Sequence, residues 1–469
     1  MNVGCNEQQG LHLQWSQIPD YPAGEVQPGQ LVLLPGGSIL IRNFMQGTGN
    51  TSSNCVGSFK KLCSFIEPDW RFHKGARVEE ILWFYAKLLR CSNFGELAET
   101  CGLRPHLIQA FHYKRDSAIS IRLALALALM QEHKLLLVER LPPMYDLEHH
   151  KLLETLQRVS RERGLSVIIG MSTSEEHYAR HMPSSRFCSH AMIRAKKIKR
   201  VPFYTQFFTL WVREFRFIHR NPWTWLTRAL STLIAALAFS FVFFKFPVNG
   251  PNAITNRVGF LSFIVTYWFV SIVSSFPEDL HVRVFIREKN FYQSIWYLLA
   301  VFYAELPILL LQVIPFSFMV FYIPGLRSTN FSSFLIFITT LSMLICACVA
   351  LGILLGSISH RKYVNSFARS VVIPLAIIFG GFLAIPRTIT WILRWLVYLS
   401  PLYFSFKILL ENELSQAGVV LNGRSGEEIL NELVQQRMSA WACWGCLLGL
   451  TAFYLLLSLL LLHVKRRKH

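Results

Sequence analysis

A glycine-rich turn follows a short apolar strand near the start of the chain. Gln30–Leu34 predicts the strand, and Gly36-Gly37-Ser38 follows it. Backbone amides of such a turn can cradle phosphate groups, but a working loop also needs a lysine for the β- and γ-phosphates and a hydroxyl for magnesium. Ile41 and Arg42 stand where those two residues would come. The sequence therefore predicts a phosphate-binding frame that lacks its usual chemistry.

Strands and helices alternate around this turn, which predicts an α/β domain with a largely parallel sheet over residues 1–200. Beside the first strand, the sequence predicts further buried strands at Lys134–Val138 and Leu165–Ile169. The predicted helices are Val78–Leu89, Ile119–Met130 and Leu147–Arg161.

The second half of the chain has apolar runs of membrane-spanning length. Phe203–His219 combines aromatic and cationic residues, so we expect a connecting helix along the membrane surface within residues 201–224. Residues 225–469 then predict an all-α domain of six spans: Trp225–Phe246, Val258–Phe276, Ala300–Ile323, Phe331–Ser357, Val371–Ile385 and Ala440–Leu462.

The positive charge of the chain gathers beside these spans. The net charge is +19 over 469 residues, and Lys465–Lys468 directly follows the last span. Glu278–Asn290 and Ser359–Arg369 carry several Lys and Arg, whereas Asn412–Met438 is net acidic. This is the positive-inside pattern, so we expect a multi-pass membrane protein with both termini in the cytosol, and we do not expect nucleic-acid binding. No signal peptide is visible, and a plasma membrane is expected rather than an internal one.

Histidine and cysteine pairs give little support for a metal or redox site. His149-His150 and His177 with His181 have no accompanying cluster of cysteines or carboxylates. Cys443 and Cys446 have the spacing of a redox motif but lie in a predicted span, where small packing residues are the simpler interpretation. We therefore expect no metal.

Each of three residues in or beside the spans can be interpreted in two ways, as a functional residue or as a structural one. Glu305 is either a functional carboxylate or a residue that caps or pairs locally at the end of a span. Tyr267 and Phe269 lie in the second span. Either they line a substrate path or they are packing or lipid-facing aromatics.

Several motifs of the membrane half resemble those of the G-type (White-type) ABC half-transporters, in which a cytosolic nucleotide-binding domain precedes six membrane helices. Asn256–Leu261 resembles the start of that family's second helix, and Phe276-Pro277-Glu278 with Val284–Glu288 resembles the loop after it. Further resemblances, in the same order as in the family, are Ala304–Ile308, Gly380–Leu383 and Trp391–Tyr403. Glycines such as Gly380-Gly381 let backbones approach closely.

In the soluble half the resemblance implies a degenerate nucleotide-binding domain. Arg115–Ile119 replaces the family's signature sequence, and Glu67 falls near its γ-phosphate-sensing glutamine. Glu139 stands for the magnesium-binding aspartate and Arg140 for the catalytic glutamate. Gly36, Gly37, Ser38, Arg42 and Glu139 are therefore the candidate cofactor-binding residues, and no catalytic residue is assigned. Arg42 and Glu139 either keep weak contacts with phosphate and magnesium or are ordinary charges of a relic domain.

The resemblance implies a half-transporter subunit that moves a lipid-like or amphipathic compound and uses ATP and magnesium. Family members work as pairs, with a cavity lined by the second and fifth helices of both chains, so Tyr267 and Phe269 become candidate substrate contacts. Loss of the phosphate-loop and catalytic residues favours a heterodimer whose partner hydrolyses ATP. The alternative is a regulatory or scaffold subunit that transports nothing.

Overall fold

A computed structural model of the chain forms two compact units, Met1–Thr209 and Leu210–His469. The boundary between the units falls inside one helix, α8 (Phe203–His219). The assignment of residues 1–200, 201–224 and 225–469 to their predicted domain types stays a prediction. The structure describes residues 2–6, 10–15, 24–26, 31–35, 63–66, 76–91, 93–108, 117–131, 133, 135–139, 146–171, 201–220, 222–244, 253–276, 285, 288, 291–326, 331–359, 362–383, 389–414, 420–421, 424–425, 428–430 and 439–468.

A four-stranded parallel sheet forms the centre of the first unit, as the sequence predicts. Its order is β4-β7-β6-β5, and every neighbouring pair is parallel. The strands are β4 (Leu31–Pro35), β5 (Cys63–Ile66), β6 (Leu135–Val138) and β7 (Ser166–Met171). All four residues of β6 are fully buried, which is typical of a parallel strand covered on both faces.

The predicted helices of this unit are present, and the structure adds elements that the pattern did not indicate. The helices are α3 (Val78–Leu89), α4 (Phe94–Thr100), η1 (Arg104–His106), α5 (Ser117–Met130) and α6 (Asp146–Arg163). A separate antiparallel sheet joins β1 (Asn2–Asn6), β2 (Gly10–Trp15) and β3 (Gly24–Val26). Strands as short as β5, with four residues, and β1, with five, give too few positions for a clear alternation to be detected.

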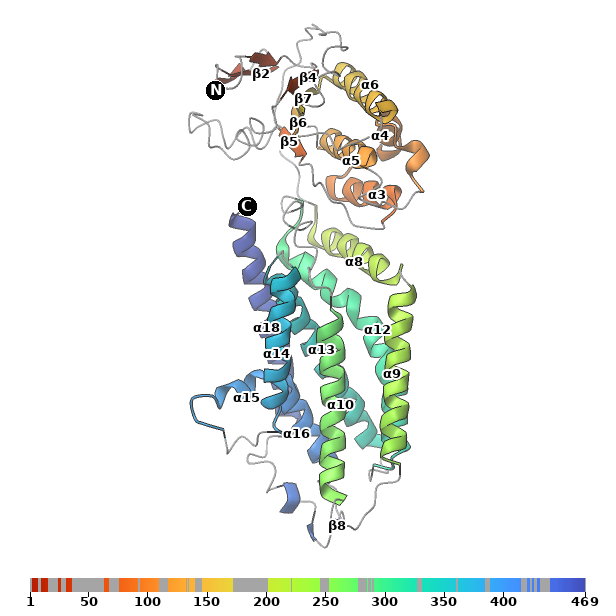
Figure 1. Cartoon of the computed structure of the whole chain (residues 1–469), viewed down its shortest axis with the longest axis vertical. Helices are drawn as coiled ribbons and strands as arrows, with labels where there is room; N and C mark the ends of the chain where they lie inside the picture. Colours follow the sequence, from red (N-terminus) through yellow and green to blue (C-terminus); the bar gives the residue numbers. More distant parts are fainter. Residues whose placement is uncertain are drawn as a thin grey trace. The chain divides into compact units, whose positions relative to one another are not determined.

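The second unit is a bundle of long helices (Figure 1). Among the residues that the structure describes, five helices are apolar enough and long enough to cross a membrane, which confirms five of the six predicted spans and a multi-pass membrane protein. They are α9 (Pro222–Val242), α10 (Ala253–Ser275), α12 (Ser294–Tyr322), α13 (Phe331–Ser357) and α18 (Ala440–Lys468). A two-stranded ribbon pairs β8 (Val420–Leu421) with β9 (Arg424–Ser425).

The predicted fifth span, Val371–Ile385, takes a different form. The helix there, α14 (Lys362–Ile378), has 17 residues, which is short of the roughly 20 that a single span needs. Gly381 follows it with a φ of +85°, a conformation that ends a helix and that side chains other than glycine rarely adopt. The chain then turns through α15 (Trp395–Leu399) into α16 (Pro401–Leu414).

Hydrogen bonds identify the two ends of this bundle. At one end, Lys465 of α18 donates to the carbonyl of Ser357, the last residue of α13 (Nζ to O, 2.6 Å), and Arg369 of α14 donates to the carbonyl of Phe276 (2.7 Å). We call this the Lys465 end. At the other, Asn412 of α16 donates to the carbonyl of Ser333, near the start of α13 (3.0 Å). We call this the Glu413 end, after the neighbouring glutamate.

Together α14 and α16 run from one end of the bundle to the other. The first turns of α14 lie at the Lys465 end, because its buried Asn365 bonds the backbone of Gly356 and Ser359. The last turn of α16 lies at the Glu413 end, because Asn412 contacts the start of α13. A broken pair of short helices therefore takes the place of the single span that the sequence predicts.

Candidate functional site

The candidate nucleotide-binding edge lies where the parallel strands of the first unit end. In a parallel sheet the carboxyl ends of all strands meet at one edge, where α/β domains commonly bind ligands. Glu139 directly follows β6 there, is 5% exposed, and its backbone N–H donates to the carbonyl of Ile66 at the end of β5 (3.0 Å). Gly36, Gly37, Ser38 and Arg42 lie outside the described residues, so their nearness to Glu139 stays a prediction.

The residues present at this edge do not make the usual set for ATP and magnesium. The buried carboxylate of Glu139 is a suitable oxygen ligand for a hard cation. The sequence nevertheless offers Ile41 and Arg42 in place of the phosphate-loop lysine and hydroxyl, and Arg140 in place of the catalytic carboxylate. Among the described residues, no three His, Cys, Asp or Glu side chains gather as a metal site.

Tyr267 and Phe269 pack inside the second unit. The ring of Tyr267 stacks on that of Phe316 in α12, with centroids 5.7 Å apart and an interplanar angle of 7°. Its hydroxyl lies 3.4 Å from the hydroxyl of Thr232 in α9. Phe269 is fully buried within the chain. These contacts are those of packing aromatics, and their role as substrate contacts stays a prediction.

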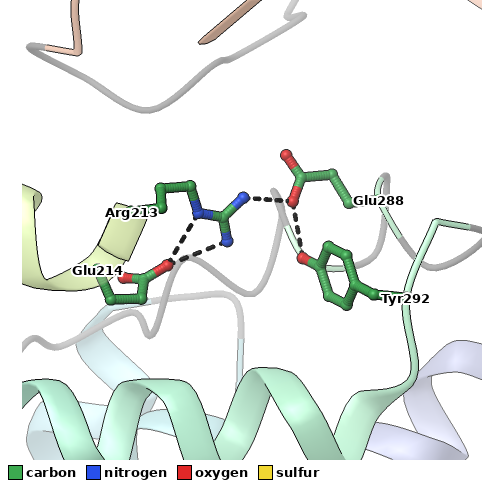
Figure 2. Close-up of polar contacts among 4 residues, drawn as sticks. All are labelled: Arg213, Glu214, Glu288 and Tyr292. Carbon is green, nitrogen blue, oxygen red and sulfur yellow. Dashed lines mark hydrogen bonds and ion pairs between the residues drawn. The ribbon is translucent and has the colours of Figure 1, made fainter. Parts of the chain in front are cut away.

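Four polar side chains of the second unit contact one another, and we call them the Arg213 cluster: Arg213, Glu214, Glu288 and Tyr292 (Figure 2). Arg213 donates to Glu288 from Nη1 (2.8 Å) and to Glu214 from Nε and Nη2 (3.2 and 3.0 Å). Tyr292 donates its phenolic proton to the same Glu288 oxygen at 2.7 Å. Two carboxylates thus share one guanidinium.

The cluster is deeply buried, and this sets its electrostatics. The side chains of Arg213, Glu214 and Glu288 are 11%, 6% and 2% exposed. Burial raises the pKa of Tyr292, and the neighbouring Glu288 carboxylate raises it further, so the phenol keeps its proton and remains a donor. Burial alone lowers the pKa of Arg213, but the carboxylates of Glu288 and Glu214 outweigh it and leave the net pKa well above its ordinary value.

Two further aromatic rings, those of Phe285 and Tyr297, support the cluster. Phe285 stacks on Tyr297 with centroids 5.1 Å apart, and Tyr292 stacks on Tyr297 at 6.0 Å. The guanidinium carbon of Arg213 lies 6.0 Å from the centre of the Tyr292 ring. These contacts join the α8 helix to the segment between α10 and α12. The site is built to hold helices together rather than to move protons or bonds.

A second ion pair lies near the same end of the bundle and resolves the two interpretations of Glu305. Its carboxylate contacts Arg228 of α9 (Nη1 to Oε2, 3.2 Å), and the same guanidinium donates to the carbonyl of Ser275 at the end of α10 (3.1 Å). Trp211 of α8 donates to the carbonyl of Tyr303 in α12 (3.2 Å). Glu305 is therefore paired, and it links α9 to α12.

Sequence reasoning missed the Arg213 cluster, although it singled out the segment that holds Glu288. Adjacent charges of opposite sign at Arg213 and Glu214, within the aromatic helix Phe203–His219, were the available signal. A pair of charges on an otherwise apolar face predicts a buried partner. The partner, Glu288, lies 75 residues away, and a single sequence contains no information that joins the two.

Comparison with known proteins finds that much of the second unit is similar to the membrane part of a family of transporters. The ABC-2 type transporter family model matches residues 205–414. ABC transporter G family member 22 of Arabidopsis thaliana is 24% identical over 234 residues, which cover 49% of this chain and 31% of the relative. ABC transporter G family member STR2 of Petunia hybrida is 25% identical over 239 residues, 49% of this chain and 32% of the relative.

These matches leave part of each relative unmatched. A third relative, ABC transporter G family member 14 of Dictyostelium discoideum, is 27% identical over 214 residues, 45% of this chain and 15% of that protein. The chain thus spans about a third or less of the curated relatives' length. Among solved structures, cbiO1 of Clostridium perfringens, part of an ABC transporter complex, aligns over 34% of this chain and 76% of its own at 13% identity. The TM-score of 0.26 is too low to establish a shared fold.

Proposed function

We propose that the chain is a subunit of the G-type ABC half-transporters, which its membrane half resembles, and that it relies on a partner chain for ATP hydrolysis. Its cargo in this proposal is a lipid-like or amphipathic compound that is exported or flipped across the membrane. The observation that carries the proposal is the contrast between the two halves. The membrane half matches the family over residues 205–414, whereas the phosphate-loop lysine and catalytic glutamate positions hold Ile41 and Arg140.

Loss of those two residues removes the groups that position and stabilise the transferred phosphate. A lysine at the β- and γ-phosphates and a carboxylate that orients the attacking water contribute much of the rate of such enzymes. Arg42 and Glu139 supply a charge and an oxygen ligand but not this arrangement. A heterodimer, in which the other half-transporter supplies a competent site, is consistent with a membrane half that has kept the family's form.

Within the second unit, the Arg213 cluster couples α8 to α12. Arg213 and Glu214 lie in the part of α8 that belongs to this unit. Arg213 attaches this helix through Glu288 and Tyr292 to the residues that lead into α12. Charged groups held at 2–11% exposure resist small displacements, because any separation would leave a buried charge unpaired. A shift of α8 would therefore move α12 with it.

The remaining parts of the proposal concern substrate and location. Tyr267 and Phe269 contact the substrate only if α10 turns or parts from α12, because both now pack within the chain. The membrane is the plasma membrane, with both termini in the cytosol. Apolar and aromatic surfaces of this kind suit flat or amphipathic compounds.

Two measurements test the proposal. The purified chain alone should hydrolyse ATP no faster than a blank membrane preparation. The chain captured from native membranes should bring a second half-transporter with it, and the captured complex should hydrolyse ATP. The matched control is the same complex in which the partner's catalytic glutamate is replaced, because its activity should then be lost while the association remains.

Other outcomes decide against the proposal. Magnesium-dependent hydrolysis by the isolated chain that Glu139→Ala abolishes would mean that this chain has its own working site. Transport by the partner that is unchanged or increased when this chain is removed would instead support a regulatory or scaffold subunit. Capture of the chain only as a monomer would contradict both forms of the heterodimer.

A further inference from the structure

A buried ion pair ties two membrane helices at the Glu413 end of the bundle. Nη1 of Arg257, in the second turn of α10, lies 2.6 Å from Oε1 of Glu413, the residue before the last of α16. The two side chains are 3% and 5% exposed although 156 residues separate them in sequence. Both helices pack against one another, and α16 lies beside the lower part of α10 in Figure 1.

An ion pair in such a setting has two stable conditions rather than a continuum. When the helices are in contact, the attraction is strong because little water screens it. When they separate, each charge must be hydrated, and a hydrated pair attracts only weakly. At intermediate separations the two charges are too far apart to attract strongly and are not yet hydrated, so this arrangement has the highest free energy. Helices joined in this way separate in one step, together with the entry of water.

We propose that the Arg257–Glu413 pair is a latch that keeps the bundle closed at the Glu413 end, and that opening of this end requires the pair to separate. The inference rests on the proposed transport function, because a latch has a role only if the bundle opens. The Lys465 end is held differently at α10, where Arg369 bonds the backbone carbonyl of Phe276. Breaking the latch should therefore open one end and leave the other closed.

The experiment measures how fast water-soluble reagent reaches the space below the latch. Leu261 lies one turn deeper on the same face of α10 as Arg257 and is 1% exposed. The full-length Leu261→Cys chain, in lipid nanodiscs with both ends in contact with water, is treated with a charged methanethiosulfonate. Labelling should be slow while the latch is intact. Arg257→Gln should accelerate it by about tenfold or more, because the buried carboxylate of Glu413 then loses its ion pair with this arginine, which favours the hydrated, open arrangement.

Three controls separate a latch from a general stabilising contact. The exchanged pair Arg257→Glu with Glu413→Arg should return labelling to the slow rate. Asn412→Ala removes a neutral tie at the same end, between α16 and Ser333, and should leave labelling slow. The native thiol of Cys348, fully buried in α13, should stay unreactive in every variant.

The proposal is overturned if Arg257→Gln leaves labelling of the introduced thiol slow, if Asn412→Ala accelerates it equally, or if Cys348 becomes reactive in parallel. The last result would mean that the whole unit loosens. If Arg257→Gln does not fold, Glu413→Gln, which removes the charge of the other partner and keeps the shape of its side chain, decides the matter by the same criteria. None of these measurements uses ATP or a transported compound, so failure of the latch is distinguishable from failure of the proposed transport function.

Discussion

At the scale of single residues, removing the hydroxyl of Tyr292 tests whether the Arg213 cluster stabilises the second unit. Tyr292→Phe removes the proton donated to Glu288 at 2.7 Å and leaves a buried carboxylate with one fewer donor. We expect a loss of about 1–3 kcal/mol in the free energy of unfolding, the usual value for a hydrogen bond to a charged group. Thermal unfolding of the purified chain in detergent measures it.

The matched control is a Tyr→Phe substitution at an exposed position of α8, Tyr204. Tyr204 is 64% exposed, and its ring contact with Phe203 does not need the hydroxyl. Tyr204→Phe should therefore change the stability by less than about 0.5 kcal/mol. Equal effects of the two substitutions would mean that the hydrogen bond to Glu288 contributes nothing specific.

His133 gives the first unit a dependence on pH. Burial lowers the pKa of this imidazole from 6.5 to about 4, and its Nδ1 lies 2.9 Å from the hydroxyl of Ser64 in β5. Because the folded pKa is below the unfolded one, the stabilisation is complete above pH 6.5 and is lost as the pH falls toward 4. Between pH 7 and pH 5 we expect the sheet to lose about 2 kcal/mol.

Hydrogen exchange of the β5 and β6 amides, corrected for the intrinsic effect of pH, measures this loss. His133→Gln has no titrating group, so its β6 amides should show a much smaller difference between the two pH values. A wild-type chain whose corrected exchange does not differ between pH 7 and pH 5 would show that His133 is not buried as a neutral ring.

At the scale of elements, Gly381 determines how α14 is followed by α16. Its φ is +85°, and a Cβ at this position would lie 2.8 Å from Cδ2 of Tyr403 in α16. The neighbour of Gly381 within this chain is the ring of Tyr403, and a close approach of backbones from two chains at the glycine pair stays a prediction. Gly381→Ala should destabilise the bundle by more than about 1 kcal/mol, because strain and the displaced ring of Tyr403 both add to the cost.

Gly449 in α18 is the control, since a Cβ there meets nothing within 4 Å and its backbone is helical. Gly449→Ala should be neutral or stabilise by up to about 1 kcal/mol. Thermal unfolding in detergent compares the two variants. Similar stability for both would mean that the α14–α16 junction tolerates a side chain, and that Gly381 is not needed for its geometry.

The elements also show how far sequence reasoning reaches. Val78–Leu89 was predicted to the residue because apolar residues repeat along it at helical spacing. In the structure, Arg90 ends this helix in a left-handed conformation. The five long spans follow from length and hydropathy alone. The fifth predicted span was wrong in form, because hydropathy records apolar length and not the break that Gly381 introduces.

The sites were harder to predict than the elements. Glu288 and Glu413 each form an ion pair with an arginine that is more than 70 residues away in the sequence. Only the packing of helices brings these partners together. Periodicity acts over one or two turns and cannot report such pairings. The sequence therefore identified Arg257 and Glu288 as parts of motifs but gave no indication of what each contacts. The candidate phosphate loop could be recognised because its residues are contiguous.

At the scale of the whole molecule, the α14–α16 pair decides the number of membrane crossings. If the two short helices cross once together, the bundle crosses six times and the chain ends on the side where it begins. Lys465–Lys468 and the residues around Lys362 then lie on one side, as the positive-inside rule requires. If they return to the side they came from, the chain crosses five times, and the basic end of α18 lies on the opposite side from Arg228 at the start of α9.

Contacts within the second unit favour six crossings. Lys465 at the end of α18 and Asn365 at the start of α14 both bond residues at the end of α13, while Asn412 of α16 bonds Ser333 near the start of α13. An epitope after His469 and one before Met1 should both be reached by antibody only after cells are permeabilised. An epitope inserted in the acidic segment 415–438 should be reached on intact cells. A reachable epitope after His469, with the other terminus protected, would establish an odd number of crossings and would mean that α14 and α16 enter and leave the membrane on one side.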